Sequence, residues 1–199
     1  MHVLMRGQPL TFAVILFLTV TPSPASADPQ ATAAITLGAA GRATKHHLWN
    51  ETVLHLGLRS DVLFGRSNVT NFGFGPYAEV LTHAFDEIQF GAGGTTLIPL
   101  IDGFPIVVSA GAYGRYSPTT SIEPGIAAAF FWGPRSFNHH NAYNMAGGLL
   151  AQFRYGLGPS GETAIILSAQ LDVVALSLPF QFVFNAIRGG SKDTRPIKK

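Results

Sequence analysis

The sequence lacks cysteine altogether and is poor in charge, since Asp, Glu, Lys and Arg make up only 12% of its 199 residues. Soluble domains carry about a quarter charged residues, so this composition is unusual for a protein whose whole surface meets water. The absence of cysteine excludes a fold held together by disulfides. Stability must therefore come from burial, from a closed hydrogen-bond ladder, or from a bilayer.

The sequence also lacks a convincing membrane-spanning helix outside its first residues. The best candidate, Ile165 to Ile187, is interrupted by Gln170, Asp172, Pro179 and Gln181, and an Asp in the middle of a membrane is costly. Yet 47% of the residues are hydrophobic and 22 are glycine. A high apolar content without apolar runs is typical of a transmembrane β-barrel, although a soluble lipid-binding β-sandwich or barrel shares it.

The first 27 residues resemble a secretory signal peptide. Arg6 provides a positive n-region, Leu10 to Val20 an apolar h-region, and Ala25-Ser26-Ala27 a small-residue cleavage site. Eleven apolar positions are too few for a membrane anchor, because a spanning helix needs about 20. We therefore expect residues 1–27 to be removed and the protein to be exported, leaving about 172 residues, enough for one domain.

The basic residues gather in the last twelve positions, where five Lys or Arg residues face a single Asp. Without the leader, positive residues number 12 and negative residues 11. The basic tail therefore accounts for the sequence pI of about 9.1. This pI does not indicate nucleic-acid binding, which would require a basic face on the folded domain.

The segment Glu51 to Phe64 carries the clearest pattern in the chain. Leu54, Leu56 and Leu58 alternate with His55, Gly57 and Arg59, so a pleated strand would have one apolar and one polar wall. In a soluble protein the apolar wall faces a core, whereas in an outer-membrane barrel it faces lipid and the polar wall faces the lumen.

Seven further segments show the same alternation. The eight expected strands are residues 31–42, 51–64, 72–85, 88–98, 106–116, 122–132, 145–157 and 162–174, each 11 to 14 residues long and separated by turn-forming stretches. A tilted strand needs roughly 9 to 11 residues to cross a bilayer. The pattern predicts an all-β fold, an antiparallel up-and-down transmembrane β-barrel of 8 strands over residues 28–175.

A different pattern follows the last expected strand. Residues 176–190 are apolar, with Ser177 suited to an N-cap, Pro179 to a first turn, Arg188 to a last turn and Gly189 to a stop. This predicts a short C-terminal helix that must be covered by protein or lie in a membrane interface. The alternative is a further strand, and residues 191–199 form the basic tail.

In leader, strand count, strand length, aromatic placement and lack of cysteine, the chain resembles the small eight-stranded outer-membrane barrels of Gram-negative bacteria. The resemblance covers residues 31–174 and implies an outer-membrane location with lipid as its partner. The chain departs from that pattern by ending in Lys198-Lys199 and not in an aromatic residue. It also has its longest connection, residues 133–144, on the side of the termini, where turns are usually short.

Most of the charged residues of the expected strands lie at the positions that alternate with the apolar, outward-facing ones. We expect the interior to hold a polar network of His55, Arg59, Asp61, Glu79, His83, Glu87, Arg115, Glu123, Gln152, Arg154 and Asp172. An eight-stranded interior has room for side chains and little else, which favours paired charges. The alternative is a ligand or proton site among Glu79, His83 and Arg115.

Two histidine pairs invite other interpretations. His139-His140 near Ser136 is similar to the Ser-His pair of the lipid A deacylases, but no serine follows the histidines directly and no carboxylate lies in the loop. A metal site shared with His46-His47 is excluded by the expected topology, which puts the pairs at opposite ends. We expect no catalytic residue, no metal and no cofactor.

The sequence therefore predicts an outer-membrane β-barrel with a closed, charge-filled lumen and a structural or interaction role. It does not identify protein partners. Two other classes stay open: a lipid-modifying barrel enzyme similar to the lipid A deacylases, and a soluble periplasmic lipid-binding β protein.

Overall fold

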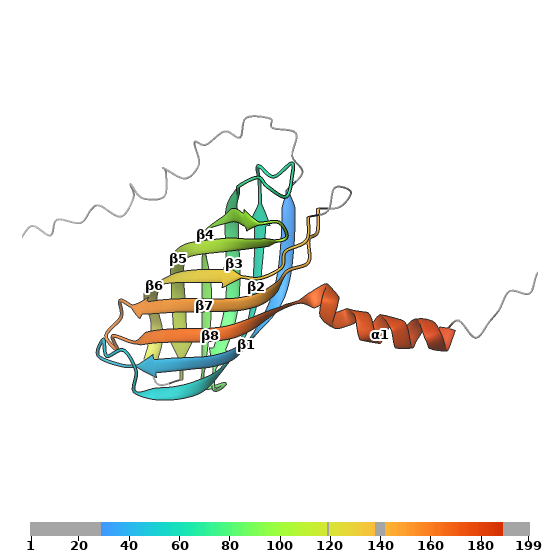
Figure 1. Cartoon of the computed structure of the whole chain (residues 1–199). Helices are drawn as coiled ribbons and strands as arrows, with labels where there is room; N and C mark the ends of the chain where they lie inside the picture. Colours follow the sequence, from blue (N-terminus) through green and yellow to red (C-terminus); the bar gives the residue numbers. More distant parts are fainter. Residues whose placement is uncertain (1–28, 119, 138–141, 189–199) are drawn as a thin grey trace, which may run out of the picture.

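The protein forms a closed barrel of eight antiparallel strands followed by one helix (Figure 1). The computed structural model describes residues 29–118, 120–137 and 142–188, so the expected leader and basic tail lie outside the described residues. The strands are β1 (Gln30–Ala43), β2 (Glu51–Leu63), β3 (Gly73–His83), β4 (Glu87–Ile101), β5 (Phe104–Ser117), β6 (Thr120–Trp132), β7 (Gly147–Gly156) and β8 (Thr163–Asp172), and the helix is α1 (Val173–Arg188).

Each strand pairs with its neighbour in sequence, and β1 pairs with β8 to close the wall. The closing ladder runs in antiparallel register from Ala34 opposite Asp172 to Ala43 opposite Thr163. Closure leaves no edge strand, so every strand has a partner on both sides. The all-β class, the closed antiparallel barrel of eight strands and the C-terminal helix expected from the sequence are confirmed.

The barrel has two ends that differ in their connections. At the end where β1 begins and α1 leaves, here called the helix end, lie residues 64–72, 102–103 and, of the β6–β7 connection, the described residues 133–137 and 142–146. At the opposite or far end lie residues 44–50, 84–86, 118 and 157–162. The longest connection therefore lies beside the termini of the barrel, as the sequence topology implied.

Side chains alternate between the two faces of the wall, with apolar groups outside and polar groups inside. The outward positions of the strands leave large apolar side chains exposed, among them Leu58 at 58%, Val80 at 51%, Ile126 at 53% and Leu167 at 61%. The inward neighbour Arg59 is only 6% exposed. This distribution is the reverse of that in a soluble globular domain.

Two small apolar clusters also lie inside the barrel. One consists of Leu63, Leu97, Val107, Ala129, Phe131, Ala146 and Leu150, mostly near the helix end of their strands. The other consists of Ala40, Leu81, Ala164 and Ile166, with Val53 packed against it, near the far end. These clusters fill the space that the charged side chains leave.

Glycines let neighbouring strands bend close together on the inner face. Gly93 of β4 and Gly111 of β5 are paired in register, and a Cβ atom added at Gly93 would lie 2.2 Å from the carbonyl oxygen of Ala110. An added Cβ at the next residue, the outward Gly94, would meet nothing within 4 Å. The inner position therefore requires glycine for steric reasons, and the outer position does not.

Helix α1 begins three residues earlier than the sequence predicts, because Asp172 and not Ser177 is its N-cap. The Asp172 Oδ1 atom accepts hydrogen bonds from the backbone N–H groups of Val174 at 2.8 Å and Ala175 at 3.3 Å. The last residue of β8 thus also starts the helix, and Pro179 lies inside it. The main contacts of α1 are with β8 and β1, and no helix in the described residues has the length and apolarity needed to cross a membrane.

We predict that Gly93→Ala destabilises the barrel, by about 1 to 3 kcal/mol, because the new methyl group overlaps backbone atoms that cannot move aside. Gly94→Ala, the adjacent control, should leave the free energy of unfolding unchanged or raise it slightly. Urea-induced unfolding followed by circular dichroism measures both. Equal effects of the two variants would show that the close approach of β4 and β5 is not tight.

Candidate functional site

All eleven residues that the sequence places on the inner face point into the barrel. Ten of them are at most 6% exposed, and the Arg115 side chain is 11% exposed. They do not form one compact site. They divide into a far-end cluster, a central cluster and a helix-end cluster, and Asp172 has an environment of its own.

The far-end cluster is organised by the guanidinium group of Arg115. Its Nε atom lies 2.6 Å from Glu87, its Nη1 atom 3.0 Å from Glu123 and its Nη2 atom 2.6 Å from Glu162. Glu123 also accepts hydrogen bonds from the backbone N–H and the hydroxyl group of Ser160. One cation thus binds three carboxylates that come from β4, β6 and the β7–β8 connection.

Arg42 of β1 extends this cluster to the rim of the barrel. It forms ion pairs with Glu51 at 2.7 Å, Asp86 at 3.1 Å and the buried Glu87 at 3.4 Å. Asp86 follows Ala84 and Phe85, which both have left-handed backbone conformations, with φ values of 50° and 62°. Such conformations cost about 1 to 2 kcal/mol for each residue with a Cβ atom, so the turn that presents Asp86 to Arg42 is strained.

The buried part of the far-end cluster has one negative charge too many. Glu87, Glu123 and Glu162 are buried and face only two guanidinium groups, those of Arg42 and Arg115. Burial, followed by repulsion from Glu87, raises the pKa of Glu162 to about 7, although Arg115 opposes the shift. Glu162 therefore takes up a proton at a higher pH than an ordinary carboxyl group does.

A metal ion is the other possible occupant of this cluster. Ligand atoms of His83, Glu87 and Glu162 lie within 4.8 Å of one another, and all three residues are buried. These residue types suit a divalent cation. However, Arg115 already contacts both carboxylates, so its guanidinium group occupies the position that a cation would take.

His83 links the carboxylates to a second histidine. Its Nδ1 atom lies 2.9 Å from Glu87, and its ring lies 5.6 Å from that of His55, which is paired opposite it on β2. The Nε2 atom of His55 lies 3.0 Å from the Thr36 hydroxyl. Among the residues that the structure describes, His55 Nδ1 and His83 Nε2 have no hydrogen-bond partner.

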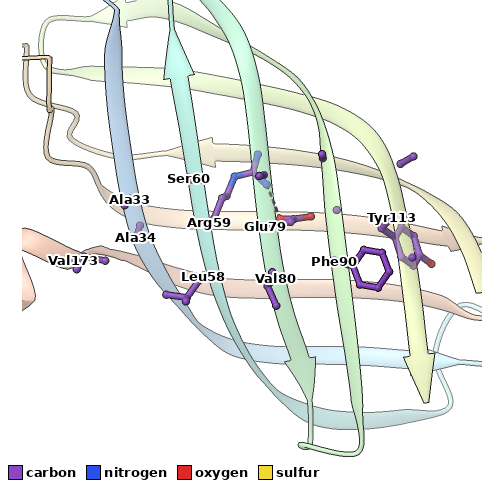
Figure 2. A pocket seen from close by; sticks show the side chains of 15 residues that line it. Ala33, Ala34, Leu58, Arg59, Ser60, Glu79, Val80, Phe90, Tyr113 and Val173 are labelled. Carbon is purple, nitrogen blue, oxygen red and sulfur yellow. Dashed lines mark hydrogen bonds and ion pairs between the residues drawn. The ribbon is translucent and has the colours of Figure 1, made fainter. Parts of the chain in front are cut away.

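The central cluster is organised by the carboxylate of Glu79. Arg59 donates to it at 2.8 Å and Gln152 at 3.3 Å, and Arg154 forms a further ion pair with it (Figure 2 draws the pair of Arg59 and Glu79). The guanidinium groups of Arg59 and Arg154 also lie over the rings of Tyr77 and Tyr113, at 4.1 and 4.8 Å. Two cations around one carboxylate are thus also stabilised by aromatic faces.

Gln89 joins the central and far-end clusters into one network. Its amide nitrogen donates to Glu87 at 2.6 Å, and its amide oxygen accepts from Arg154 at 2.8 Å. The three residues of the suggested ligand or proton site, Glu79, His83 and Arg115, are therefore linked through Gln89 and Glu87 but are not gathered at one point. Gln89 lies at an expected inward position but was not among the residues predicted for the network.

The helix-end cluster depends on arginines from the connections. Arg135 of the β6–β7 connection binds the carboxylate of Asp61 through two nitrogens, one of them at 3.1 Å. Arg66 of the β2–β3 connection donates to Gln30 at 2.9 Å. Sequence reasoning missed both arginines, because period-2 alternation identifies inward residues only within strands.

Asp172, the last member of the predicted network, has a separate environment. Its Oδ2 atom accepts hydrogen bonds from the Tyr143 hydroxyl at 2.9 Å and from the backbone N–H of Ala146 at 3.2 Å. The Tyr143 hydroxyl is also 3.1 Å from the carbonyl oxygen of Ala33. Asp172 thus joins β1, β8, α1 and the β6–β7 connection.

The residues considered for a deacylase-like pair do not form one in the described structure. The Ser136 hydroxyl donates to the Met145 carbonyl at 3.2 Å and accepts from the Met145 N–H at 2.8 Å. His139 and His140 lie outside the described residues. His46 and His47 lie in the far-end connection between β1 and β2, where the His46 ring stacks on Tyr155 with a centroid distance of 4.7 Å.

A hollow of about 910 Å³ lies along the outer face of the wall and crosses β1 to β5 (Figure 2). It forms where small outward residues are paired strand by strand, namely Ala33, Ser60, Ala78, Ala92 and Ala112. Leu58, Val80, Phe90 and Val173 also line it. The hollow is apolar, since Arg59 and Glu79 point inward from the same strands.

The arrangement suits charge compensation better than catalysis. Each carboxylate of the network is bound by a guanidinium, amide, imidazole or hydroxyl group. Searches of protein-family models, of curated proteins and of solved structures found no match to the chain.

We predict that Glu162 makes the stability of the barrel pH-dependent. Its pKa in the folded state, about 7, lies above its unfolded value, so the folded state binds more protons and stability falls as the pH rises from about 4.5 to 7. Glu162→Gln should remove this loss, raising the free energy of unfolding by about 1 to 3 kcal/mol at pH 8 and by almost nothing at pH 5. Urea titrations at several pH values measure the difference; the same gain at pH 5 and pH 8 would contradict it.

We also predict that Glu79→Gln costs about 3 to 5 kcal/mol, because it leaves two buried guanidinium groups without a carboxylate. Glu51→Gln is the matched control, since the Glu51 side chain is 53% exposed and a surface pair contributes about 1 kcal/mol at most. The free energy of unfolding of both variants tests the prediction. Similar small losses would mean that water reaches the central cluster.

Proposed function

We propose that this protein is an outer-membrane β-barrel whose closed, charge-filled interior serves a structural or interaction role. The observation that carries the proposal is the exposed apolar outer wall, which surrounds a buried charged interior. A water-soluble protein rarely exposes a contiguous apolar patch of more than a few hundred Å². In a bilayer the same wall is solvated by acyl chains, and closure satisfies the backbone hydrogen bonds.

The outward aromatic residues support a transmembrane position. Exposed rings gather at both ends of the wall: Phe64, Phe74, Phe104 and Trp132 near the helix end, and Trp49, Phe85 and Tyr116 near the far end. Outer-membrane barrels carry such girdles where the wall meets the lipid headgroups. The strands, of 10 to 15 residues, are long enough to span the space between the girdles, since about 9 to 11 residues cross a bilayer.

The contents of the interior argue against a channel. Ion pairs cross it at the far end, in the centre and at the helix end, and apolar clusters fill space between them. An eight-stranded barrel has little interior volume beyond that of its side chains. An enzymatic role is not favoured, because the Ser136 hydroxyl is hydrogen-bonded to the backbone of Met145.

The location is tested by cell fractionation. We expect the protein to stay with outer membranes through carbonate extraction, and the unboiled folded protein to migrate differently from the boiled protein on a denaturing gel. Release by carbonate would contradict the proposal and favour a soluble periplasmic protein. Lipid A mass spectrometry with and without the gene tests the enzymatic alternative, for which changed acylation is required.

We predict that Leu58→Arg impairs insertion, because an arginine facing lipid near the bilayer midplane costs about 2 to 4 kcal/mol. Leu48→Arg is the control: Leu48 is 65% exposed but lies in the far-end connection between β1 and β2. The yield of heat-modifiable protein after refolding into vesicles measures both. A Leu58→Arg variant that refolds as well as the control would show that the outer wall does not face lipid.

A further inference from the structure

We propose that α1 is an interfacial anchor that binds the anionic lipid surface at the helix end of the barrel. This inference rests on the proposed function, because it needs a bilayer around the barrel. The surface that the helix binds is a layer of phospholipid headgroups. The apolar sides of the helix lie at the boundary with the acyl chains, and its one narrow polar side faces water.

The helix carries a single polar stripe. Its polar residues are Ser177, Gln181, Asn185 and Arg188, which at about 100° per residue fall within roughly 80° of the circumference. Ser177 and Gln181 are hydrogen-bonded along the stripe at 2.8 Å. The other three quarters of the helix are apolar, a distribution suited to a helix lying in a membrane interface.

The apolar side of α1 is not covered by the barrel. Phe180, Phe182 and Ile187 are 77%, 72% and 75% exposed, and the helix projects away from the end of β8 (Figure 1). The helix-end mouth is instead occupied by Arg135 and Arg66, bound to Asp61 and Gln30. A role for α1 as a plug of the mouth is therefore not supported.

The length of α1 favours the interface over a second span. Sixteen residues extend about 24 Å, whereas the hydrocarbon core is about 30 Å thick. Its first residue, Val173, also lies on the outer face and lines the hollow of the wall. The Asp172 cap therefore starts the helix at the surface that the proposed function places against lipid.

The basic residues at and after the end of α1 indicate that the headgroups it binds are anionic. Arg188 is in the last turn, with its guanidinium group 4.4 Å from the centre of the Phe184 ring. The sequence that follows contains Lys192, Arg195, Lys198 and Lys199 against a single Asp193. Basic residues next to an apolar helix favour anionic phosphate groups, with a gain of about fivefold in binding for each residue near the surface.

The test uses the absence of cysteine, since a single cysteine added to the full chain can carry an environment-sensitive fluorophore such as NBD. We compare Phe182→Cys on the apolar side, Gln181→Cys on the polar stripe and Leu58→Cys on the barrel wall. Each labelled chain is refolded into anionic phosphatidylglycerol vesicles, and lipids with a doxyl quencher near the headgroup or deep in the acyl chain report contact.

We expect the probe at 182 to be quenched about twofold more than that at 181, and more by the shallow quencher than by the deep one, because interfacial helices lie about 5 to 10 Å into the boundary. In neutral phosphatidylcholine vesicles, or after Arg188→Gln, quenching at 182 should fall while that at 58 stays unchanged.

Two results separate this inference from the proposed function. An unquenched probe at 182 together with a quenched probe at 58 would overturn the anchor but not the transmembrane barrel. Disulfide crosslinking of the unlabelled Phe182→Cys variant to a second copy of itself would also overturn the anchor and not the barrel. An unquenched probe at 58 would overturn the barrel's position in the bilayer as well. Equal quenching at 181 and 182, or at 182 in neutral and anionic vesicles, would also contradict the anchor.

Discussion

The structure depends on the neutralisation of charge inside a wall that has no edges. Closing eight strands satisfies the backbone and encloses a narrow interior, so a charge placed there has little access to water and needs a partner across the barrel. Arg115 and Glu79 meet this requirement in opposite ways, one as a cation among three carboxylates and the other as a carboxylate between two guanidinium groups. Gln89 connects the Arg115 cluster with the Glu79 cluster, so a single hydrogen-bonded network links strands that are far apart in sequence.

The sequence predicts the wall well because alternation is a local signal. In β2, for example, each of Leu54, Leu56 and Leu58 is next to a residue of the opposite face, and one closed register follows from many such segments. The contents of the interior are less predictable. The pairing of Asp61 with Arg135 joins residues 74 apart, one of them in a connection without periodicity, and the alternation of strands contains no signal for it.

The start of α1 was mispredicted for a related reason. Ser177 and Pro179 form a reasonable N-terminal signal in the sequence, but Asp172 caps the helix first, and the chain changes from strand to helix without a loop. The alternation of β8 predicts that Asp172 faces the lumen. Its role as the helix N-cap can be recognised only when the last residue of the strand is known. Helix boundaries depend on which cap is available in three dimensions as well as on local preference.

Asp172 and Tyr143 together straddle the seam where the first and last strands meet, and this has a consequence for the order of assembly. The Tyr143 hydroxyl accepts a hydrogen bond from the Ala33 N–H at 3.4 Å on one side of the seam and donates to Asp172 on the other. Asp172 in turn accepts hydrogen bonds from the N–H of Ala146 and from the first N–H groups of α1. The complete set of bonds exists only once residues more than a hundred positions apart have come together. The bonds that cap α1 are local and need no contact with β1, so the helix can be capped before the cylinder closes. Closure then links the capping residue to the first strand through Tyr143.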